Sequence, residues 1–194
     1  MRLLLATTNA GKLREIRGIL AHAPVELVSL TDFPGIAEPE ETGSTFAENA
    51  RLKALYYNEK TGLPAVADDS GLEIDALGGA PGVHSARWQG DDYPTKFAVI
   101  RRELSERGLR TSPARFIAQI ALADQGRVVF EATGIVEGEI AAEPRGTHGF
   151  GYDPIFYYPP FSCTLAEVDG PRKAAVSHRG MAFRQLADWL PNLS

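Results

Sequence analysis

The stretch Arg2-Leu3-Leu4-Leu5-Ala6-Thr7-Thr8-Asn9-Ala10-Gly11-Lys12 decides the fold, because it joins an apolar run to a helix through a short polar turn. The run over 2–6 is typical of a buried strand, and apolar residues at helical spacing begin at Leu13. Small and hydroxyl residues let backbone amides approach an anion, while the helix N-terminus and Lys12 add positive charge. The stretch therefore predicts a strand and a helix joined by a phosphate-binding turn.

This turn resembles a Walker A loop but departs from it at two positions. The pattern G-x-x-x-x-G-K-[ST] needs glycine where Ala6 stands and a hydroxyl where Leu13 stands, and that hydroxyl normally holds Mg²⁺. A nucleotide bound here would need its metal held elsewhere in the chain. The alternative is an ordinary strand-to-helix connection with Asn9 as N-cap and Lys12 in solvent.

The composition is that of a globular chain with one domain over residues 1–194 and room for two lobes: 44% of the residues are hydrophobic and 23% are charged. A formal net charge of -5 with dispersed basic residues argues against a nucleic-acid polymer as partner but allows a small anionic ligand. The single cysteine, Cys163, cannot form an internal disulfide. With neither a signal peptide nor an apolar span of about 20 residues, we expect a cytoplasmic protein without membrane contact.

The order of the expected elements predicts a mixed sheet. Thr45-Phe46-Ala47-Glu48 is a capping box that begins a helix, and Asp124-Gln125-Gly126 is typical of a hairpin turn. We expect helices from 13 to a stop at 22–24, from 45 to about 59, over 94–108 and after Ser177, strands over 2–6, 25–29, 65–68, 115–123, 127–136 and 155–157, and a loop over 31–43. Helix-strand alternation followed by a hairpin favours a mixed, mainly extended sheet with helices packed on it, an α/β or α+β architecture.

The adjacent carboxylates Asp68 and Asp69 are the strongest candidates for chemistry. The run over 65–68 predicts a buried strand that ends in the turn Asp69-Ser70-Gly71. Consecutive side chains of a strand point to opposite faces, so the two carboxylates should differ in role unless the turn rotates one of them. We assign Asp69 as metal ligand and candidate general base, and Asp68 as a residue that orients a neighbour or the metal's ligands. The alternative for Asp69 is a solvated Asx turn.

Two further acidic residues, Glu40 and Glu41, lie in the expected loop. They are candidates to complete a hard-cation site, since Mg²⁺ is typically held by one or two carboxylates plus water and substrate phosphates. A solvated, charged loop is the alternative. On the helix that follows, Asn49 and Lys53 share one face at spacing i, i+4.

Basic residues stand at the start of the last expected helix, for which Ser177 is the natural N-cap. His178 and Arg179 then fall in the first turn, where a cation opposes the helix dipole at a cost of about 0.3–1 kcal/mol at exposed sites. This placement predicts an acceptor or an anion nearby, and Lys173 adds a third donor. The alternative is a set of basic side chains in solvent.

A glycine-rich loop places Phe150 before Gly151, Tyr152 and Asp153. Such a loop brings backbone close to a ligand, offers an aromatic face for stacking and offers a carboxylate for a ring N–H. Core packing of the aromatic ring is the alternative. The coexistence of phosphate-type cations, acidic residues and an aromatic face favours a nucleotide site.

Taken together, these motifs resemble those of the non-canonical purine nucleoside triphosphate pyrophosphatases, also called inosine triphosphate pyrophosphatases. The matching stretches are 7–12, Glu41-Thr42-Gly43, Ala67-Asp68-Asp69-Ser70-Gly71-Leu72, Leu77-Gly78-Gly79-Ala80-Pro81-Gly82, Phe150-Gly151-Tyr152-Asp153-Pro154 and Ser177-His178-Arg179-Gly180. The resemblance implies Mg²⁺-dependent hydrolysis of ITP, dITP and XTP to the monophosphate and pyrophosphate, which cleanses the nucleotide pool. It also implies an elongated, two-lobed α/β domain with a long mixed β-sheet flanked by helices, an active site in the cleft, and a homodimer.

The resemblance also implies roles for single residues. Asp69 is implied as proton acceptor and metal ligand, and Glu41 fits the metal better than Glu40 because it precedes the matching Thr42-Gly43. Lys53 and Asp68 resemble residues important for activity. The implied substrate-binding residues are Thr7, Thr8, Asn9, Ala10, Gly11 and Lys12 for the triphosphate, Ser70 for a further contact, and Phe150, Gly151, Tyr152, Asp153, Lys173, His178 and Arg179 for the base.

Two other functions stay open at this point. One is a protein that binds or senses a nucleoside triphosphate without cleaving it, against which the intact Asp68-Asp69 pair argues. The other is a nucleotide pyrophosphatase with a different base preference, which the base-pocket motif disfavours.

Overall fold

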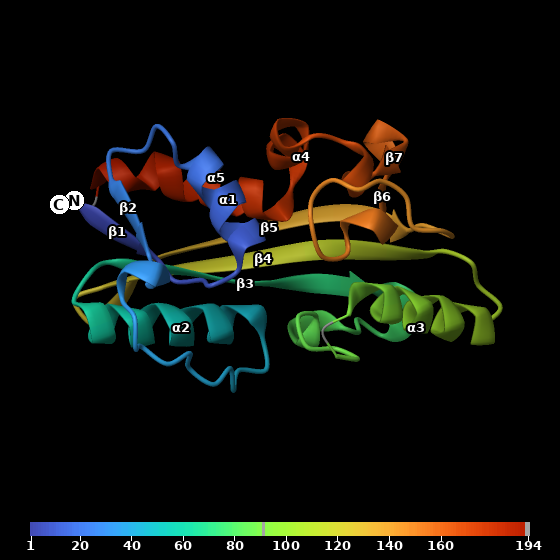
Figure 1. Cartoon of the computed structure of the whole chain (residues 1–194), viewed down its shortest axis with the longest axis horizontal. Coiled ribbons are helices and arrows are strands. Elements are labelled where there is room, and N and C mark those ends of the chain that lie inside the picture. The colour runs from blue at the N-terminus through green and yellow to red at the C-terminus, as the bar shows by residue number, and fades with distance from the viewer. Residues whose placement is uncertain (91, 193–194) are drawn as a thin grey trace. The chain divides into compact units, whose positions relative to one another are not determined.

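The computed structural model describes residues 1–90 and 92–192, and it divides the chain into two compact units. The first unit comprises Met1–Asp69, Ala118–Gly134 and His178–Ser194, and the second comprises Ser70–Ile117 and Ile135–Ser177. The strands of the described chain hydrogen bond in the order β2-β1-β3-β4-β5-β6-β7 (Figure 1). Their bounds are β1 Arg2–Leu5, β2 Glu26–Ser29, β3 Ala65–Ile74, β4 Ser112–Asp124, β5 Arg127–Ile140, β6 Phe156–Tyr158 and β7 Cys163–Thr164.

The sheet is mixed, as the sequence predicts. β1 runs parallel to both β2 and β3, whereas β6 is antiparallel to β5 and to β7. The helices are α1 Ala10–Ile19, α2 Phe46–Thr61, α3 Tyr93–Glu106, α4 Gly170–Val176 and α5 His178–Trp189. The α/β class with helices packed on a mixed sheet is confirmed, and the elongated shape and the cleft stay predictions. No helix in the described part of the chain is long and apolar enough to cross a membrane.

In the first unit, helices cover both faces of the strands (Figure 1). Leu3 and Leu5 pack with α1 and α5, while Leu4 lies in a separate cluster with α2, because alternate side chains of β1 point to opposite faces. Helix α5 presents an apolar face to this side, since Phe183 and Leu186 are fully buried in the same cluster as Leu3.

The second unit has an apolar core of its own. Leu72 and Ile74 of β3 pack with residues of α3, β4, β5 and β6, and the rings of Phe116 and Phe156 lie 4.4 Å apart between centroids. The capping box that begins α2 in the first unit is confirmed: the Glu48 amide donates to Thr45 Oγ1 (3.2 Å), and the Thr45 amide donates to Glu48 Oε2 (3.2 Å). The hairpin between β4 and β5 is confirmed as well, with positive φ at Gln125 and Gly126 as in a type I′ turn.

Several predicted boundaries are wrong: β4 begins at Ser112 instead of 115, and β5 ends at Ile140 instead of 136. Two further errors lie at candidate site residues. Helix α1 begins at Ala10 instead of Leu13, because the Asn9 side chain accepts the Lys12 amide (3.0 Å) and so caps the helix before the apolar periodicity starts. Strand β3 does not turn at Asp69 but continues to Ile74, because burial in the second core outweighs the turn preference of Asp-Ser-Gly. The short elements β7 and α4 were not predicted.

Candidate active site

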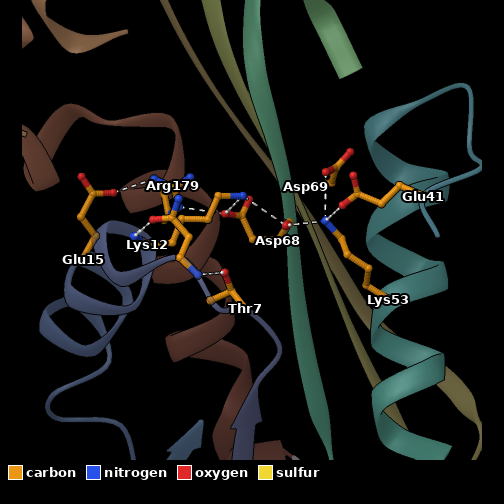
Figure 2. A network of polar contacts seen from close by, with 9 residues as sticks. Thr7, Lys12, Glu15, Glu41, Lys53, Asp68, Asp69 and Arg179 are labelled. Atoms are coloured by element: carbon orange, nitrogen blue, oxygen red, sulfur yellow. Dashed lines mark hydrogen bonds and ion pairs between the residues drawn. The ribbon is translucent and has the colours of Figure 1, made fainter. Parts of the chain in front are cut away.

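Strand β3 sends its two neighbouring carboxylates to opposite faces. Val66 packs with α1 and α5, and Ala67 packs with α2, so the alternation continues with Asp68 toward α1 and α5 and Asp69 toward α2. Figure 2 shows the two side chains on either side of the strand, each among different partners. The different surroundings of the two carboxylates therefore follow from the regular strand itself, and their different roles stay a prediction.

On the first face, Asp68 lies between two cations. Its Oδ2 is 3.1 Å from Lys12 Nζ of α1 and accepts Arg179 Nε of α5 at 2.9 Å. Arg179 also donates from Nη1 to Glu15 Oε2 at 2.6 Å, which fixes the guanidinium between two carboxylates (Figure 2). The acceptor expected for a cation in the first turn of α5 is thus provided by the protein.

The electrostatics of this face keep Asp68 ionised. Burial alone would raise the pKa of Asp68, but Arg179 and Lys12 outweigh it and hold that pKa well below its usual range. Burial lowers the pKa of Lys12 despite the attraction of Asp68. Since a carboxylate with a depressed pKa is a poor proton acceptor, Asp68 is a fixed anion that positions cations.

On the second face, a single ammonium group joins two carboxylates. Lys53 Nζ lies 2.7 Å from Glu41 Oε1 and 3.0 Å from Asp69 Oδ1. Asn49 Nδ2 donates to Asp69 Oδ2 at 3.3 Å, and the Asn49 side-chain oxygen accepts the amide of Gly43 at 2.8 Å. Because Asn49 and Lys53 are one helical turn apart, α2 presents both groups to Asp69 at once.

On this second face the pKa of the Asp69 carboxylate is raised, whereas that of Asp68 is lowered. Burial raises the pKa of Asp69 above its ordinary value even though Lys53 opposes the shift. Burial alone would lower the pKa of Lys53, but Asp69 and Glu41 outweigh it and raise that pKa. Of the two adjacent carboxylates, Asp69 is therefore the one suited to accept a proton.

The backbone carbonyl of Asp68 connects the two faces. The register between β1 and β3 ends with the pair Leu5 and Val66, and the amide of Ala6 donates to the Val66 carbonyl at 2.9 Å. The next carbonyl on this edge of β3 belongs to Asp68, two residues further along. At that position β1 has ended and the chain has entered the turn, so β1 offers no amide to this carbonyl. Lys12 Nζ (3.4 Å) and Lys53 Nζ (3.0 Å) both donate to the Asp68 carbonyl, from opposite faces of the strand. The two ammonium groups therefore converge on one peptide.

The turn that follows β1 presents backbone donors. Thr7 Oγ1 accepts the amide of Asn9 at 3.2 Å, which tightens the turn into the start of α1. Within the described residues, the amides of Thr8, Ala10 and Gly11 have no hydrogen-bond acceptor. Free amides at the N-terminus of a helix, with an ammonium group nearby, are suited to phosphate oxygens.

The donor set on the α2 face fits a hard cation. Asp69 and Glu41 reach the same ammonium group, and two carboxylates completed by water and substrate phosphates are a common Mg²⁺ arrangement. Glu40 is exposed and makes no hydrogen bond or ion pair with the rest of the described chain, so only Glu41 joins Asp69. Across residues 1–90 and 92–192, no group of three or more His, Cys, Asp or Glu side chains forms a metal cage of protein ligands alone.

The second unit holds a separate polar group in its glycine-rich loop. Asp153 Oδ2 accepts both Lys173 Nζ (2.5 Å) and the amide of Phe150 (2.8 Å), and Lys173 Nζ lies 4.7 Å from the centre of the Phe150 ring. Gly149 has a positive φ of +72°, and a Cβ there would collide with Asp153 Oδ2. The glycine is thus required for the carboxylate to fold back onto its own loop.

The predicted site residues fall into these two units. Those in the first unit are Thr7, Thr8, Asn9, Ala10, Gly11, Lys12, Glu40, Glu41, Lys53, Asp68, Asp69, His178 and Arg179, and those in the second are Ser70, Phe150, Gly151, Tyr152, Asp153, Lys173. Arg179 is paired with Asp68 and Glu15, and its contact with a base stays a prediction. Sequence reasoning missed Glu15, although it lies one turn after Lys12 on α1, and it noted Asn49 without assigning it a role.

Comparison with known proteins gives consistent matches over nearly the whole chain. The family model described as the Ham1 family matches residues 3–189. A protein of Geobacillus kaustophilus named dITP/XTP pyrophosphatase is 47% identical over 188 residues, which cover 95% of this chain and 91% of that protein. Another of the same name, from Desulforamulus reducens, is 45% identical over 195 residues, covering 100% and 97% of the two chains.

Solved structures agree with these matches. A HAM1 protein from Coxiella burnetii superposes with a TM-score of 0.90 at 42% identity, covering 99% of both chains. A structure from Mycobacterium abscessus, titled nucleoside-triphosphatase / dITP/XTP pyrophosphatase, has a TM-score of 0.75 at 44% identity and covers 98% of this chain and 100% of that one.

Proposed function

Because the chain belongs to the Ham1 family, we propose that it hydrolyses the non-canonical purine nucleoside triphosphates dITP, ITP and XTP to the nucleoside monophosphate and pyrophosphate. The observation that carries the proposal is the pair of neighbouring carboxylates in β3 with opposite surroundings, Asp68 held between cations and Asp69 with a raised pKa. This reaction removes unwanted nucleotides from the pool before they are used.

Binding of the triphosphate falls to the turn after β1. The amides of Thr8, Ala10 and Gly11 donate to phosphate oxygens at the positive end of α1, and Lys12 adds a charge from the first turn of that helix. Lys12 also neutralises the negative charge that develops on the pyrophosphate leaving group. Asp68 keeps Lys12 in place through the ion pair at 3.1 Å.

The chemical step uses Asp69 as general base. Its carboxylate accepts a proton from a water molecule, whose oxygen forms a bond to the α-phosphorus while the bond from that phosphorus to the bridging oxygen breaks. Pyrophosphate leaves with the electrons of the broken bond. Lys53 orients the Asp69 carboxylate from α2 at 3.0 Å and adds positive charge beside the reacting phosphate.

Asp69 and Glu41 would hold Mg²⁺, which supplies positive charge to the triphosphate when it is bound. Asn49 fixes the second oxygen of Asp69, so the carboxylate is oriented before any ligand arrives. Glu40 has no part in this arrangement.

Recognition of the base is assigned to the glycine-rich loop of the second unit, and the family resemblance also implies a part in it for His178 and Arg179 of the first unit. Phe150 offers a stacking face, and Asp153 and Lys173 offer an acceptor and a donor beside it. Donors such as His178 and Arg179 favour the 6-oxo group of hypoxanthine and xanthine over the amino group of adenine, because a buried donor left without an acceptor is costly. Exclusion of guanine then depends on the 2-position of the ring.

The assembly and location follow from the family resemblance. We propose a homodimer that acts in the cytoplasm, where the nucleoside triphosphate pool is found. Sedimentation of the purified protein tests the first statement, and cell fractionation tests the second.

A substrate panel with pyrophosphate detection tests the function. We expect release of pyrophosphate from dITP, ITP and XTP in the presence of Mg²⁺, and much slower release from ATP and GTP. Equal rates for ITP and ATP would refute the donor arrangement. Binding of ITP without any pyrophosphate release would make the protein a sensor instead of an enzyme.

A further inference from the structure

A buried ammonium group on α3, in the second unit, has no part in the site described above. Lys96 is fully buried, with 0% of its surface exposed. Its Nζ donates to the backbone carbonyls of Ala86 (2.6 Å) and Ser85 (3.3 Å). A position that served only to fill space would favour an apolar side chain, because burying an ammonium group is costly unless polar groups compensate it.

Two aromatic rings also lie close to this ammonium group. Lys96 Nζ lies 4.5 Å from the centre of the Tyr93 ring and 5.8 Å from that of Tyr152. The two rings meet edge to face with centroids 5.2 Å apart. Tyr93 and Lys96 lie one helical turn apart on α3, so the beginning of this helix presents a cation and an aromatic ring to Tyr152 together.

The Ser85 carbonyl ties Lys96 to the glycine-rich loop. Tyr152 donates its hydroxyl hydrogen to the same carbonyl at 2.8 Å. Ser85 is itself held in place, since its Oγ accepts the amide of Leu72 in β3 (2.9 Å) and donates to the Gly82 carbonyl (2.6 Å). Lys96 and Tyr152 are therefore fastened to one anchored peptide.

A second contact reaches the loop directly. A Cβ placed on Gly151 would lie 3.5 Å from Tyr93 Oη, so the Tyr93 ring packs on the backbone of the loop. Phe150 and Asp153, the members of the loop assigned to the base, stand on either side of Gly151 and Tyr152. Movement of Tyr152 or of the Gly151 backbone would move both of them.

We propose that Lys96 is a positioning residue for base recognition: through Tyr93, Ser85 and Tyr152 it fixes the loop over 149–153 and so sets the preference for 6-oxopurines. The inference rests on the proposed function, since it concerns the base that this loop receives. It assigns to Lys96 an effect on substrate affinity and selectivity, while the reacting groups on β3 and α2 are left unchanged.

The test compares Lys96→Met, which keeps the length of the side chain but removes its charge, with the wild type. We expect KM for dITP to rise about tenfold with kcat changed less than about twofold, because the loop binds the base and takes no part in the proton transfer. The ratio of kcat/KM for dITP to that for dATP should fall. Calorimetric affinity for inosine monophosphate should weaken in parallel, which gives a readout without turnover.

A second variant and a control distinguish an effect on base recognition from a general loss of stability. Tyr152→Phe removes only the hydroxyl bond to Ser85 and should shift KM and the dITP preference in the same direction, with a smaller change in thermal midpoint. Asn58→Ala in the first unit removes another buried polar side chain, which bonds Leu63 and Gly126, and should lower the midpoint without changing KM.

If Lys96→Met and Tyr152→Phe lose stability but keep the KM, the dITP preference and the monophosphate affinity of the wild type, Lys96 is structural only and the proposal is wrong. Failure of the proposed function looks different, because the wild type would then release no pyrophosphate from dITP at all.

Discussion

Asp68 and Asp69 are neighbours in the chain but lie in opposite electrostatic surroundings. The pKa of Asp68 is held down by Arg179 and Lys12, whereas burial raises the pKa of Asp69. The first carboxylate is consequently a permanent anion near neutral pH, and the second can take up a proton. The difference arises from the face of β3 on which each side chain lies and from the cations that α1, α2 and α5 bring to it.

Replacing Asp69 by asparagine removes the proton acceptor while keeping the shape of the side chain. We expect kcat to fall by about 10²–10⁴-fold, the range that general-base catalysis supplies, with little change in the thermal midpoint. Asp75→Asn is the matched control, because Asp75 is half exposed and pairs only with Arg115 within the described chain. Near-normal turnover of the Asp69 variant would contradict its assignment as base.

For single residues, the sequence predicted features that follow from one local rule. It did not predict contacts between residues far apart in the chain. Alternation along a strand was enough to predict that Asp68 and Asp69 point to opposite faces. The partners of Arg179 could not be predicted, because Glu15 and Asp68 are separated from it by 164 and 111 positions in the chain. A cation in the first turn of a helix indicated that an acceptor exists but could not identify it.

The capping box at Thr45 and Glu48 stabilises the N-terminus of α2, the helix that carries the site residues Asn49 and Lys53. The pKa of Glu48 is lowered by its hydrogen bonds from Ser44 and Thr45, so its ionised form stabilises the folded state. A group whose pKa is lowered on folding contributes stability above its unfolded pKa, and that contribution is lost as the pH falls through the folded pKa. Stability from Glu48 is thus present at neutral pH and lost in acid.

Glu48→Gln tests this dependence by urea unfolding at several pH values. We expect the variant to be less stable than the wild type at pH 7 and the difference to shrink as the pH falls below about 4. Loss of the hydrogen bonds from Ser44 to the carboxylate is the physical cause. A difference that stayed constant over the whole pH range would show that the charge of Glu48 has no part in it.

Helix α5 and strand β5 approach each other closely at one glycine. A Cβ on Gly134 would collide with the carbonyl oxygen of His178, in the first turn of α5. Gly134→Ala should therefore destabilise the protein by about 3 kcal/mol and reduce activity, since it displaces the turn that carries Arg179. Chemical denaturation and turnover of dITP measure the two effects.

Gly18→Ala is the natural comparison for this substitution. Nothing lies within 4 Å of a Cβ at Gly18, which is in α1 and has no positive φ. Here we expect a gain of about 0.5–1 kcal/mol because alanine favours the helix. Equal effects of the two substitutions would show that close packing at Gly134 does not limit the fold.

Elements with local signals could be predicted from the sequence, and those that depend on burial could not. The capping box at Thr45 and the turn at Gln125-Gly126 are local, and both were placed correctly. The predicted end of β3 was wrong. Asp69-Ser70-Gly71 has the composition of a turn, but Leu72 and Ile74 beyond it are buried in the second core. Long-range packing outweighed the local preference there.

At the scale of the molecule, each unit has an apolar core, and the two carboxylates proposed to hold Mg²⁺ already share an internal cation. Glu41 and Asp69 both pair with Lys53, so removing the metal leaves no uncompensated cluster of negative charge. The order of helices, strands and hairpin was enough to predict a mixed α/β sheet. The division of the site residues between two units could not be predicted, because strands β3, β4 and β5 each contribute residues to both.

Metal removal should consequently abolish activity but not folding. With an excess of EDTA we expect loss of dITP hydrolysis and an unchanged thermal midpoint, followed by recovery of turnover when Mg²⁺ is restored. Circular dichroism during heating and pyrophosphate release measure the two quantities on the same sample. A large drop in the midpoint with EDTA would mean that the metal is a structural component of the first unit.

The regular alternation of β3 also bears on how this chain can diverge. A single inserted or deleted residue between Ala65 and Asp68 would exchange the faces of the two carboxylates, so that the carboxylate proposed as base would lie beside Arg179 and the other would lie beside Lys53. Loops elsewhere can lengthen or shorten without this effect. Between Ala65 and Asp68, related sequences can therefore tolerate a conservative substitution more readily than an insertion or a deletion.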